Sequence, residues 1–343
     1  MKIHILCNDG SPLGITHRDI FGKNGRVGVG GAELAMLTLA EGWTKGGHQV
    51  VLFNDPLRQG ESPFEQRNIS DFERDTQSDV LIVFRSPNQK VLSANTGLRV
   101  WMSTDQYTVS DFKHFAQFVD KIVTISPYHS NYFRRVYGIE NSIPIDLPVR
   151  MWEYEQAVEK VPNRLIFTSV PDRGLGIVAE TFPKIKEQIP DASLVITSDY
   201  RLWGVASPMN QQYIQSFMRV GNVEFLGAVP RERLVQEQLA AQIHYFPCTY
   251  EELFCIAVAE SQVAGTLPIT SDMGALRTTN MGVLIHCEAG SDVNKQMFVQ
   301  TTIEYLKNPD LVYHQSELRK LTTERFSLDR ILKEWETRVF NGI

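Results

Sequence analysis

Residues 243–265 have the sequence IHYFPCTYEELFCIAVAESQVAG. The first four residues favour a buried β-strand, and Pro247 with the polar residues behind it favours a turn. The rest is typical of an apolar helix, with Glu252 near its start and Glu260 about two turns further on. A strand followed directly by a helix is the building unit of parallel sheets, so this stretch predicts an α/β fold.

Short strands with apolar residues on both faces recur on either side of this stretch, and helical patterns separate them. Buried parallel strands have this composition because helices cover both faces of their sheet. The further strands that the sequence predicts span residues 2–7, 48–53, 79–84, 98–102, 121–125, 164–168, 193–197, 223–226 and 267–270. Since right-handed crossovers join such strands, each half of the chain is expected to form a doubly wound parallel sheet.

The length of 343 residues is enough for about two domains. The alternation of strands and helices breaks over residues 141–160, which contain two prolines. We therefore expect a Rossmann-like domain over residues 1–150, a second one over residues 151–325, and a helix over residues 326–343 that packs back on the first domain. Ligands of open parallel sheets bind beyond the carboxyl ends of the strands, so two such domains facing a central cleft would hold a ligand between them.

The composition is that of an ordinary globular protein, with 43% hydrophobic and 22% charged residues. Acidic residues outnumber basic ones by 40 to 34, and the formal net charge of -6 disfavours a nucleic acid partner. The four cysteines show no C-x-x-C spacing, and no apolar run approaches the roughly 20 residues of a membrane span. We expect a cytoplasmic protein with at most peripheral membrane contact. The candidate for this contact, or for an anionic acceptor, is the pair Arg134 and Arg135 with Phe133 and Tyr137 on a predicted helix, and a solvated basic edge is the alternative.

The helix after Pro247 carries the residues best suited to bind an anion. The backbone N–H groups of Phe254, Cys255 and Ile256 lie at its predicted start, where helices bind phosphate groups. A nucleoside diphosphate held there would let Glu260 accept hydrogen bonds from ribose hydroxyls, while Glu252 reaches hydroxyls of a group attached to the outer phosphate. The alternative is that Glu252 only favours the helix dipole and that Glu260 faces solvent or a buried arginine.

Arg173 follows the predicted strand 164–168 in a Pro-Asp-Arg-Gly turn. Its planar guanidinium is suited to phosphate oxygens, and an exposed arginine in a polar turn is the alternative interpretation. Gly30 and Gly31 precede a predicted helix, where residues without side chains either let the backbone approach a ligand or form a simple helix entry. The His, Cys, Asp and Glu residues show no spacing typical of a metal site, so no metal ion is expected.

These motifs resemble those of the retaining GT-B glycosyltransferases of family 4, the glycosyl transferases group 1. The segment from Glu252 to Glu260 is similar to the Glu-x7-Glu signature of the family, and Gly30-Gly31 is similar to its first glycine-rich loop. Residues 223–230, which include Gly227, resemble the strand and loop that flank the nucleobase.

Two further positions match the family in part. Arg173 stands where the family has a lysine that neutralises the diphosphate, and Thr168 replaces an arginine of the same site. Asp105 matches the aspartate of a His-Asp pair near the reacting sugar, and Thr104 replaces the histidine. Asp105 either binds a sugar hydroxyl or caps the turn that follows it.

The resemblance implies a GT-B enzyme whose carboxy-terminal domain binds a nucleoside-diphosphate-sugar and whose amino-terminal domain supplies the acceptor side. It implies transfer with retention of anomeric configuration, with Glu252, Arg173 and Asp105 as the catalytic residues. No cofactor is expected, because the sugar nucleotide is a substrate, and the acceptor is a glycan, a lipid or a small molecule. Two rivals stay open: a sugar-nucleotide epimerase or hydrolase of the same fold, and a protein that binds sugar nucleotides without catalysis.

Overall fold

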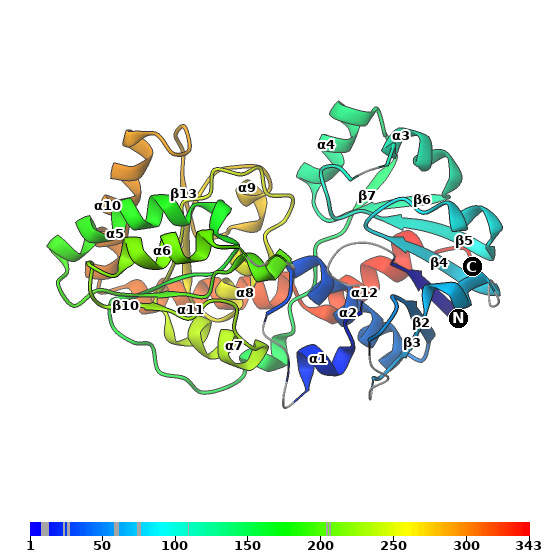
Figure 1. Ribbon diagram of the computed structural model, residues 1–343, viewed down its shortest axis with the longest axis horizontal. Helices are drawn as coiled ribbons and strands as arrows, with labels where there is room; N and C mark the ends of the chain where they lie inside the picture. The colour runs from blue at the N-terminus through cyan, green and yellow to red at the C-terminus, as the bar shows by residue number, and fades with distance from the viewer. Residues whose placement is uncertain are drawn as a thin grey trace. The chain divides into compact units, whose positions relative to one another are not determined.

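The chain forms two compact units (Figure 1). The computed structural model describes residues 1–7, 14–22, 25, 28–57, 62–73, 77–108, 110–203, 205 and 207–343. Unit 1 comprises Met1–Gly25, Gly30–Pro148 and Phe326–Ile343, and unit 2 comprises Arg26–Val29 and Val149–Arg325. The boundaries expected from the sequence lie after residues 150 and 325.

Unit 1 is built on a seven-stranded parallel sheet in the order β3-β2-β1-β4-β5-β6-β7. Its strands are β1 (Lys2–Leu6), β2 (Gln49–Phe53), β3 (Glu65–Arg67), β4 (Gln77–Phe84), β5 (Asn95–Met102), β6 (Lys121–Thr124) and β7 (Ser142–Pro144). The chain first adds β2 and β3 on one side of β1 and then β4 to β7 on the other. Residues 80–84 of the central strand β4 are all buried, as expected for a parallel strand covered on both faces.

Helices and short 3-10 turns of unit 1 cover this sheet. They are α1 (His17–Phe21), α2 (Gly31–Lys45), η1 (Ile69–Glu73), η2 (Gln89–Ser93), α3 (Phe112–Phe115), η3 (Ala116–Phe118), α4 (Pro127–Tyr137), α12 (Leu328–Glu334) and the π-helical turn η7 (Trp335–Val339). The ring of Trp101 on β5 contacts Phe112 of α3 and Phe133 of α4. Because Phe133 is fully buried, it belongs to the core and not to the exposed face that carries Arg134 and Arg135.

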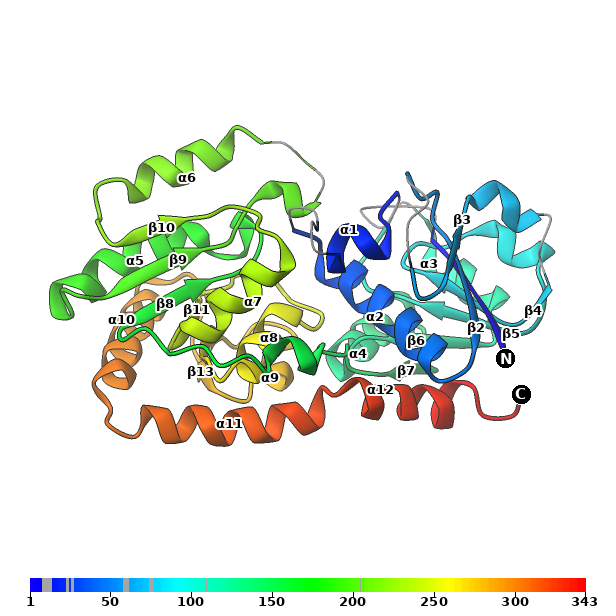
Figure 2. The ribbon, with the colours of Figure 1, turned by 90° about the horizontal axis from the view of Figure 1, so that it is seen from below.

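Unit 2 contains a six-stranded parallel sheet in the order β10-β9-β8-β11-β12-β13. Its strands are β8 (Arg164–Phe167), β9 (Ser193–Ile196), β10 (Val223–Phe225), β11 (Ile243–Phe246), β12 (Leu267–Ser271) and β13 (Val283–Ile285). Its helices are α5 (Leu175–Gln188), α6 (Met209–Phe217), α7 (Arg231–Ala240), α8 (Ile256–Val263), α9 (Leu276–Thr279), α10 (Asp292–Lys307) and α11 (Leu311–Arg325), with 3-10 turns η4 (Met151–Tyr154), η5 (Pro171–Arg173) and η6 (Tyr200–Trp203). Helices α5, α6 and α10 pack together on one face, and α7, α8 and α11 lie on the other (Figures 1 and 2).

The carboxy-terminal residues 326–343 pack within unit 1. The indole of Trp335 meets that of Trp43 on α2 edge to face, with ring centroids 5.1 Å apart. A Cβ at Gly42 would come within 2.8 Å of the Leu332 side chain, so α2 and α12 are in close contact at this glycine. The ammonium of Lys121 donates to the carbonyl oxygen of Val339 over 2.6 Å, which ties the end of the segment to β6.

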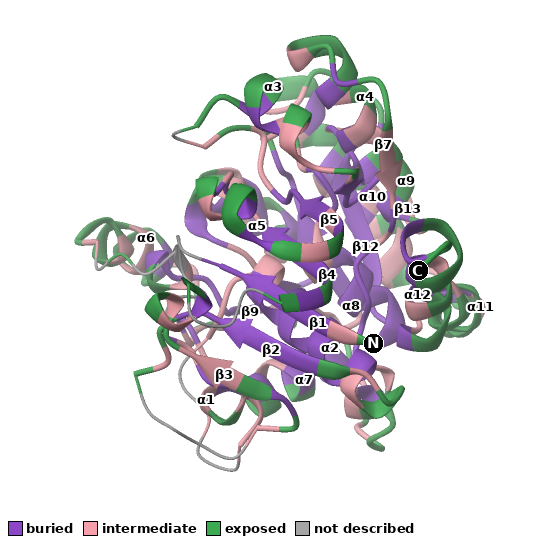
Figure 3. Cartoon of the chain, turned by 90° about the vertical axis from the view of Figure 1, so that its right-hand side faces the viewer, coloured by how far each residue is buried: buried purple, intermediate pink, exposed green. Residues whose placement is uncertain are grey.

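The sequence missed β3, β7 and β13, each of which is a three-residue strand at the edge of its sheet. Edge strands are partly exposed and therefore lack the continuous apolar pattern of a central strand. In Figure 3, β2 is largely buried whereas β3 is partly exposed. In β7, Pro144 lacks an N–H group and is tolerated because the strand has a neighbour on one side only.

None of the helices in the described ranges is long and apolar enough to cross a membrane.

The contact between α12 and α2 predicts a large loss of stability when Trp335 is shortened. Trp335→Ala should lower the free energy of unfolding by about 3–5 kcal/mol, since it removes a fully buried aromatic side chain. The measurement is urea unfolding followed by circular dichroism. Tyr313→Ala is the control, because this aromatic side chain is 64% exposed and should change the value by less than about 0.5 kcal/mol. An equally small effect of Trp335→Ala would contradict the importance of this contact.

Candidate functional site

Five loops of unit 2 contact one another along the carboxyl edge of its sheet. We call them the carboxyl-edge loops, and they span residues 168–174, 197–201, 226–230, 247–255 and 272–275, following β8, β9, β10, β11 and β12. Ligands of open parallel sheets bind at this edge, because the loops there are free of the packing constraints of the strands.

Arg173 and Glu252 form the central ion pair of these loops. The Arg173 Nε lies 2.9 Å from the Glu252 Oε1, and the two side chains are 16% and 15% exposed. The guanidinium also stacks on the ring of Tyr250, with its carbon 3.4 Å from the ring centroid. Two residues predicted from separate motifs therefore lie side by side, because β8 and β11 are neighbouring strands.

Two glycines allow this close approach of the loops. Gly174 has a φ of 114°, and a Cβ there would collide with the carbonyl oxygen of Pro247. Gly274 has a φ of 58°, and a Cβ there would collide with the carbonyl oxygen of Glu252, which accepts a hydrogen bond from the N–H of Ala275. The backbone of Glu252 is thus fixed from the β12 side, and its carboxylate is fixed from the β8 side.

Burial and nearby charges shift the pKa values of Glu252 and of the neighbouring Cys248 and Cys255 thiols. Burial raises the pKa of the Glu252 carboxyl, and Arg173 opposes this effect. Burial also raises the pKa of the Cys248 and Cys255 thiols, and the charge of Glu252 adds to it, so both residues are held as thiols and not as thiolates.

Helix α8 begins at Ile256, four residues later than the sequence indicated, and Glu252 lies in the loop before it. The N-cap is Cys255, which has a φ of 71° and a ψ of 79°, a left-handed conformation that side chains disfavour. Its carbonyl oxygen accepts the hydrogen bonds of Val258 and Ala259. The predicted anion-binding residues are therefore the last loop residue Phe254, the N-cap and the first residue of the helix. An early helix start is prevented because the loop backbone at Glu252 pairs with Ala275.

Glu260 lies on α8 and is buried. Its Oε1 is 2.7 Å from the Nη1 of Arg231, whose side chain is also buried. Burial raises the pKa of Glu260, Arg231 opposes the effect and Glu153 adds to it. The structure thus gives Glu260 the buried arginine that the sequence left open as an alternative, and the contact of Glu260 with a ribose stays a prediction.

The loop after β9 holds functional candidates that the sequence analysis missed. Asp199 accepts hydrogen bonds from the backbone and side chain of Arg201, and Gly227 of the β10 loop lies against both residues with a φ of 70°. Tyr200 donates its hydroxyl to Asp172 over 2.5 Å, directly beside Arg173. The signal that could have revealed these residues is their position right after a buried strand.

In unit 1, Arg85 joins Asp105 to the glycine-rich loop. The Arg85 Nε donates to Asp105 Oδ2 over 2.5 Å, and its Nη1 donates to Glu33 Oε1 over 3.0 Å. The Glu33 carboxylate folds back over Gly30, where it leaves no room for a Cβ, and Gly31 is the first residue of α2. Sequence reasoning missed Arg85, although it follows β4 as Asp105 follows β5.

Thr104 and Thr168, which replace family residues, are both buried. The Thr168 hydroxyl lies 3.3 Å from Nε2 of His244, and burial lowers the pKa of His244 to about 3, so this imidazole is neutral. Within the described ranges, no group of three or more His, Cys, Asp or Glu side chains could hold a metal ion.

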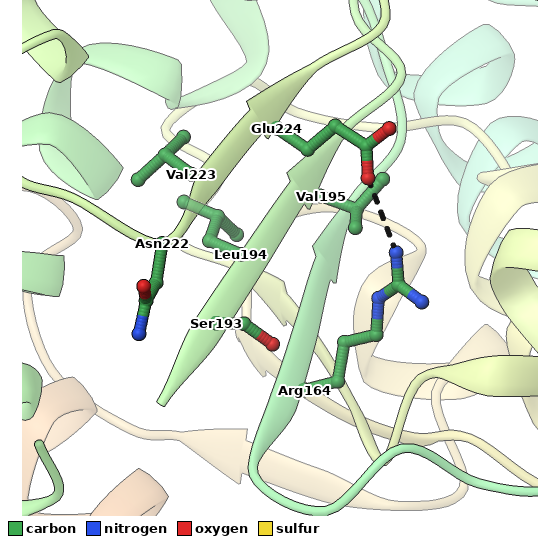
Figure 4. A pocket seen from close by; sticks show the side chains of 7 residues that line it. All are labelled: Arg164, Ser193, Leu194, Val195, Asn222, Val223 and Glu224. Atoms are coloured by element: carbon green, nitrogen blue, oxygen red, sulfur yellow. Dashed lines mark hydrogen bonds and ion pairs between the residues drawn. The ribbon is translucent and has the colours of Figure 1, made fainter. Parts of the chain in front are cut away.

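A separate cavity of about 300 Å³ lies at the opposite edge of the unit 2 sheet (Figure 4). It is lined by Arg164, Ser193 and Val223, which are the first residues of β8, β9 and β10. Arg164 pairs there with Glu224 over 3.4 Å. This cavity is therefore distinct from the carboxyl-edge loops.

The fold resembles those of solved glycosyltransferases over nearly its whole length. The complex of Anabaena Alr3699/HepE with UDP-glucose has a TM-score of 0.74 at 14% identity, with 99% of each chain covered. Sucrose-phosphate synthase from Thermosynechococcus elongatus has a TM-score of 0.73 at 16% identity, with 100% of each chain covered. WaaG, a glycosyltransferase of lipopolysaccharide biosynthesis, has a TM-score of 0.71 at 14% identity, covering 99% of this chain and 100% of that one. The chain therefore has the GT-B fold predicted from its sequence.

Sequence comparison points to the same class of enzymes. Residues 162–321, nearly all of unit 2, match the model of the family described as Glycosyl transferases group 1. The phosphatidyl-myo-inositol mannosyltransferases of Mycobacterium tuberculosis and Mycobacterium bovis are 26% identical over 107 residues. That match covers 31% of this chain and about a quarter (26%) of the mycobacterial proteins. The resemblance inferred from the motifs is confirmed at the level of this family.

The left-handed backbone of Cys255 predicts an unusual order of stability among its variants. Cys255→Gly should be more stable than Cys255→Ala by about 1–2 kcal/mol, because only glycine adopts this conformation without strain. Urea unfolding of both variants measures the difference. At Ala257, inside the same helix, substitution by glycine should instead cost up to about 1 kcal/mol. An alanine variant at residue 255 as stable as the glycine variant would show that the N-cap is unstrained.

Proposed function

We propose that this protein is a glycosyltransferase that moves a sugar from a nucleoside-diphosphate-sugar to an acceptor, with retention of configuration and without a metal ion. The observation that carries the proposal is the Arg173–Glu252 pair, 2.9 Å apart, in the loops after β8 and β11. It lies in the part of the chain that matches the family model of the glycosyl transferases group 1. The HepE structures, which contain UDP or UDP-glucose, support a nucleotide-sugar as the donor.

In the proposed reaction, the diphosphate of the donor lies between Arg173 and the start of α8. Breaking the bond to the sugar builds negative charge on the leaving phosphate, and the guanidinium and the backbone N–H groups of the helix start stabilise that charge. Glu252 accepts a hydrogen bond from a hydroxyl of the transferred sugar. The departing phosphate oxygen takes the proton of the acceptor hydroxyl, so no further protein base is needed.

Unit 1 is proposed to bind the acceptor, which is a glycan, a lipid or a small molecule. Asp105 would accept a hydrogen bond from a sugar hydroxyl, because Arg85 already holds its carboxylate in one orientation. Gly30 and Gly31 are proposed to contact the donor, because residues without side chains let the backbone approach it closely. Cys248, Cys255 and Cys287 form no disulfide bond, which supports a reducing compartment such as the cytoplasm.

The test is donor turnover with a panel of UDP-, GDP- and ADP-sugars. A donor at 100 times its dissociation constant stabilises the protein by roughly 2.7 kcal/mol, so a thermal-shift screen first identifies the base and the sugar. Release of nucleoside diphosphate that depends on an added acceptor, with the sugar found on the acceptor, supports transfer. Turnover to free sugar or to an epimer without an acceptor would replace the proposal by a hydrolase or an epimerase. Binding without turnover would replace it by a binding protein.

Arg173→Ala should weaken binding of the nucleoside diphosphate by roughly 10- to 100-fold, the effect of losing a charge-assisted hydrogen bond of about 1.5–3 kcal/mol. Binding of the bare nucleoside should change much less, because it has no phosphate. Calorimetry with both ligands measures the two affinities. Equal losses for both would place Arg173 away from the diphosphate.

Metal independence is tested by sugar transfer in excess EDTA after dialysis. The rate should change little, because Arg173 and the start of α8 supply the positive charge that a divalent ion supplies elsewhere. A loss of transfer that magnesium or manganese restores would show that the reaction needs a metal ion and that these groups do not suffice.

A further inference from the structure

Glu260 belongs to a closed ring of buried polar side chains on the α7 and α8 side of unit 2. Arg231 pairs with Glu260 over 2.7 Å and donates to the hydroxyl of Tyr154 over 3.1 Å. The Tyr154 hydroxyl donates to Oε1 of Gln238 over 2.7 Å, and Nε2 of Gln238 donates to Oε2 of Glu260 over 3.5 Å, which closes the ring. Glu153 closes the remaining side of the guanidinium, with its Oε2 2.7 Å from Nε.

Burying the charged groups of this ring costs free energy, so the ring is an unfavourable way to stabilise a fold. Arg231 and Glu260 expose only 7% and 3% of their side chains, so both charges have lost most of their hydration. Apolar residues of similar volume at such sites are often as stable or more so. A buried pair beside a proposed ligand site therefore points to a role in binding.

The position of Glu260 indicates which part of the ligand is involved. It lies on α8 four residues after the helix start at Ile256, where the diphosphate is proposed to bind. In a nucleoside diphosphate, the ribose is joined directly to the diphosphate. A carboxylate that is fixed about one turn along this helix is placed to accept hydrogen bonds from ribose hydroxyls.

We propose that Arg231 is a positioning residue for the donor, which holds the Glu260 carboxylate oriented toward the ribose hydroxyls. The inference rests on the proposed function, since it needs a nucleoside diphosphate at the start of α8. Arg231 itself does not touch the ligand.

Charge supports this role. Burial raises the pKa of Glu260, Glu153 adds to the increase, and Arg231 opposes both. The other charged groups of the surrounding elements are engaged elsewhere: Arg150 pairs with Glu153, Arg319 of α11 donates to the carbonyl of Tyr154, and Lys160 donates to the carbonyl of Ala264. Loss of Arg231 therefore removes the cation that directly compensates Glu260.

A change in the pH dependence of binding should follow when Arg231 is removed. With Arg231 present, the cation opposes the rise in the pKa of Glu260, so the affinity for the nucleoside diphosphate should vary little with pH. In Arg231→Met, the pKa of Glu260 rises further, so the carboxyl binds a proton more readily as the pH falls, and the protonated carboxyl cannot accept from both ribose hydroxyls. Affinity should then be weakest at low pH and recover as the pH rises.

The experiment is calorimetry with whichever of UDP, GDP and ADP binds the unmodified protein best. Arg231→Met and Glu260→Gln should each weaken binding roughly tenfold at pH 6.5, as for the loss of a charge-assisted hydrogen bond. The double variant should also lose roughly tenfold and not a hundredfold, because both changes disable one interaction. The affinity of the double variant for the nucleotide should not depend on pH, because glutamine at position 260 carries no titratable proton. Arg233→Met, on the exposed side of the same helix, is the matched control and should bind like the unmodified protein.

Each outcome decides the inference. If none of the three nucleotides binds the unmodified protein, the proposed function fails and the inference with it. If a nucleotide binds but Glu260→Gln leaves its affinity unchanged, or the losses in the double variant multiply, Arg231 has only a structural role and the inference alone is wrong. If Arg231→Met does not fold, Arg231→Lys replaces it: partial retention of affinity and a flat pH profile support the inference, while a full loss with a flat profile overturns it.

Discussion

The ion pair between Arg173 and Glu252 is the interaction on which the arrangement of the unit 2 site depends. It joins the loops after β8 and β11, which start from neighbouring parallel strands and so leave the sheet at the same edge. Gly174 and Gly274 let the surrounding backbone close in on the pair from both sides. A larger residue at either position would separate the loops and with them the two charged groups that the proposed reaction needs together.

Unit 1 also has an ion pair that joins the loops after two neighbouring strands, and it is formed by different residues. Arg85 follows β4 and Asp105 follows β5, and these strands are also parallel neighbours. The arginine again pairs with a carboxylate of the next loop, and a glycine, Gly30, again gives the carboxylate of Glu33 the space it occupies. The two units share no visible sequence similarity, so the common feature follows from the geometry of parallel strands, which end together and bring the loops that follow them within reach of one another.

This geometry also determines what the sequence could predict. Central strands such as β4 and β11 are continuous apolar runs and were predicted, whereas the edge strands β3, β7 and β13 are too short and too exposed to carry such a pattern. Arg173 and Glu252 could be proposed because each follows a recognisable strand. The partners of Asp105 and Glu260 could not be predicted, because the sequence does not show which residues come into contact in the fold. Arg85 lies 20 residues from Asp105, and Arg231 and Glu260 lie on different helices, α7 and α8.

The start of α8 was predicted too early because residues 252–255 have a local preference for helix. Residues 252–255 look helical in the sequence, yet the carbonyl oxygen of Glu252 accepts the N–H of Ala275, so its backbone is used for a contact between loops. The helix therefore begins after the left-handed Cys255, and Glu252 becomes a loop residue that faces Arg173. The later start has an electrostatic consequence for the proposed reaction. Burial already raises the pKa of Glu252, and a diphosphate that shares Arg173 would add negative charge beside it. The guanidinium alone would then serve two anions, so the partial positive charge at the helix start is needed as the second cationic partner of the diphosphate.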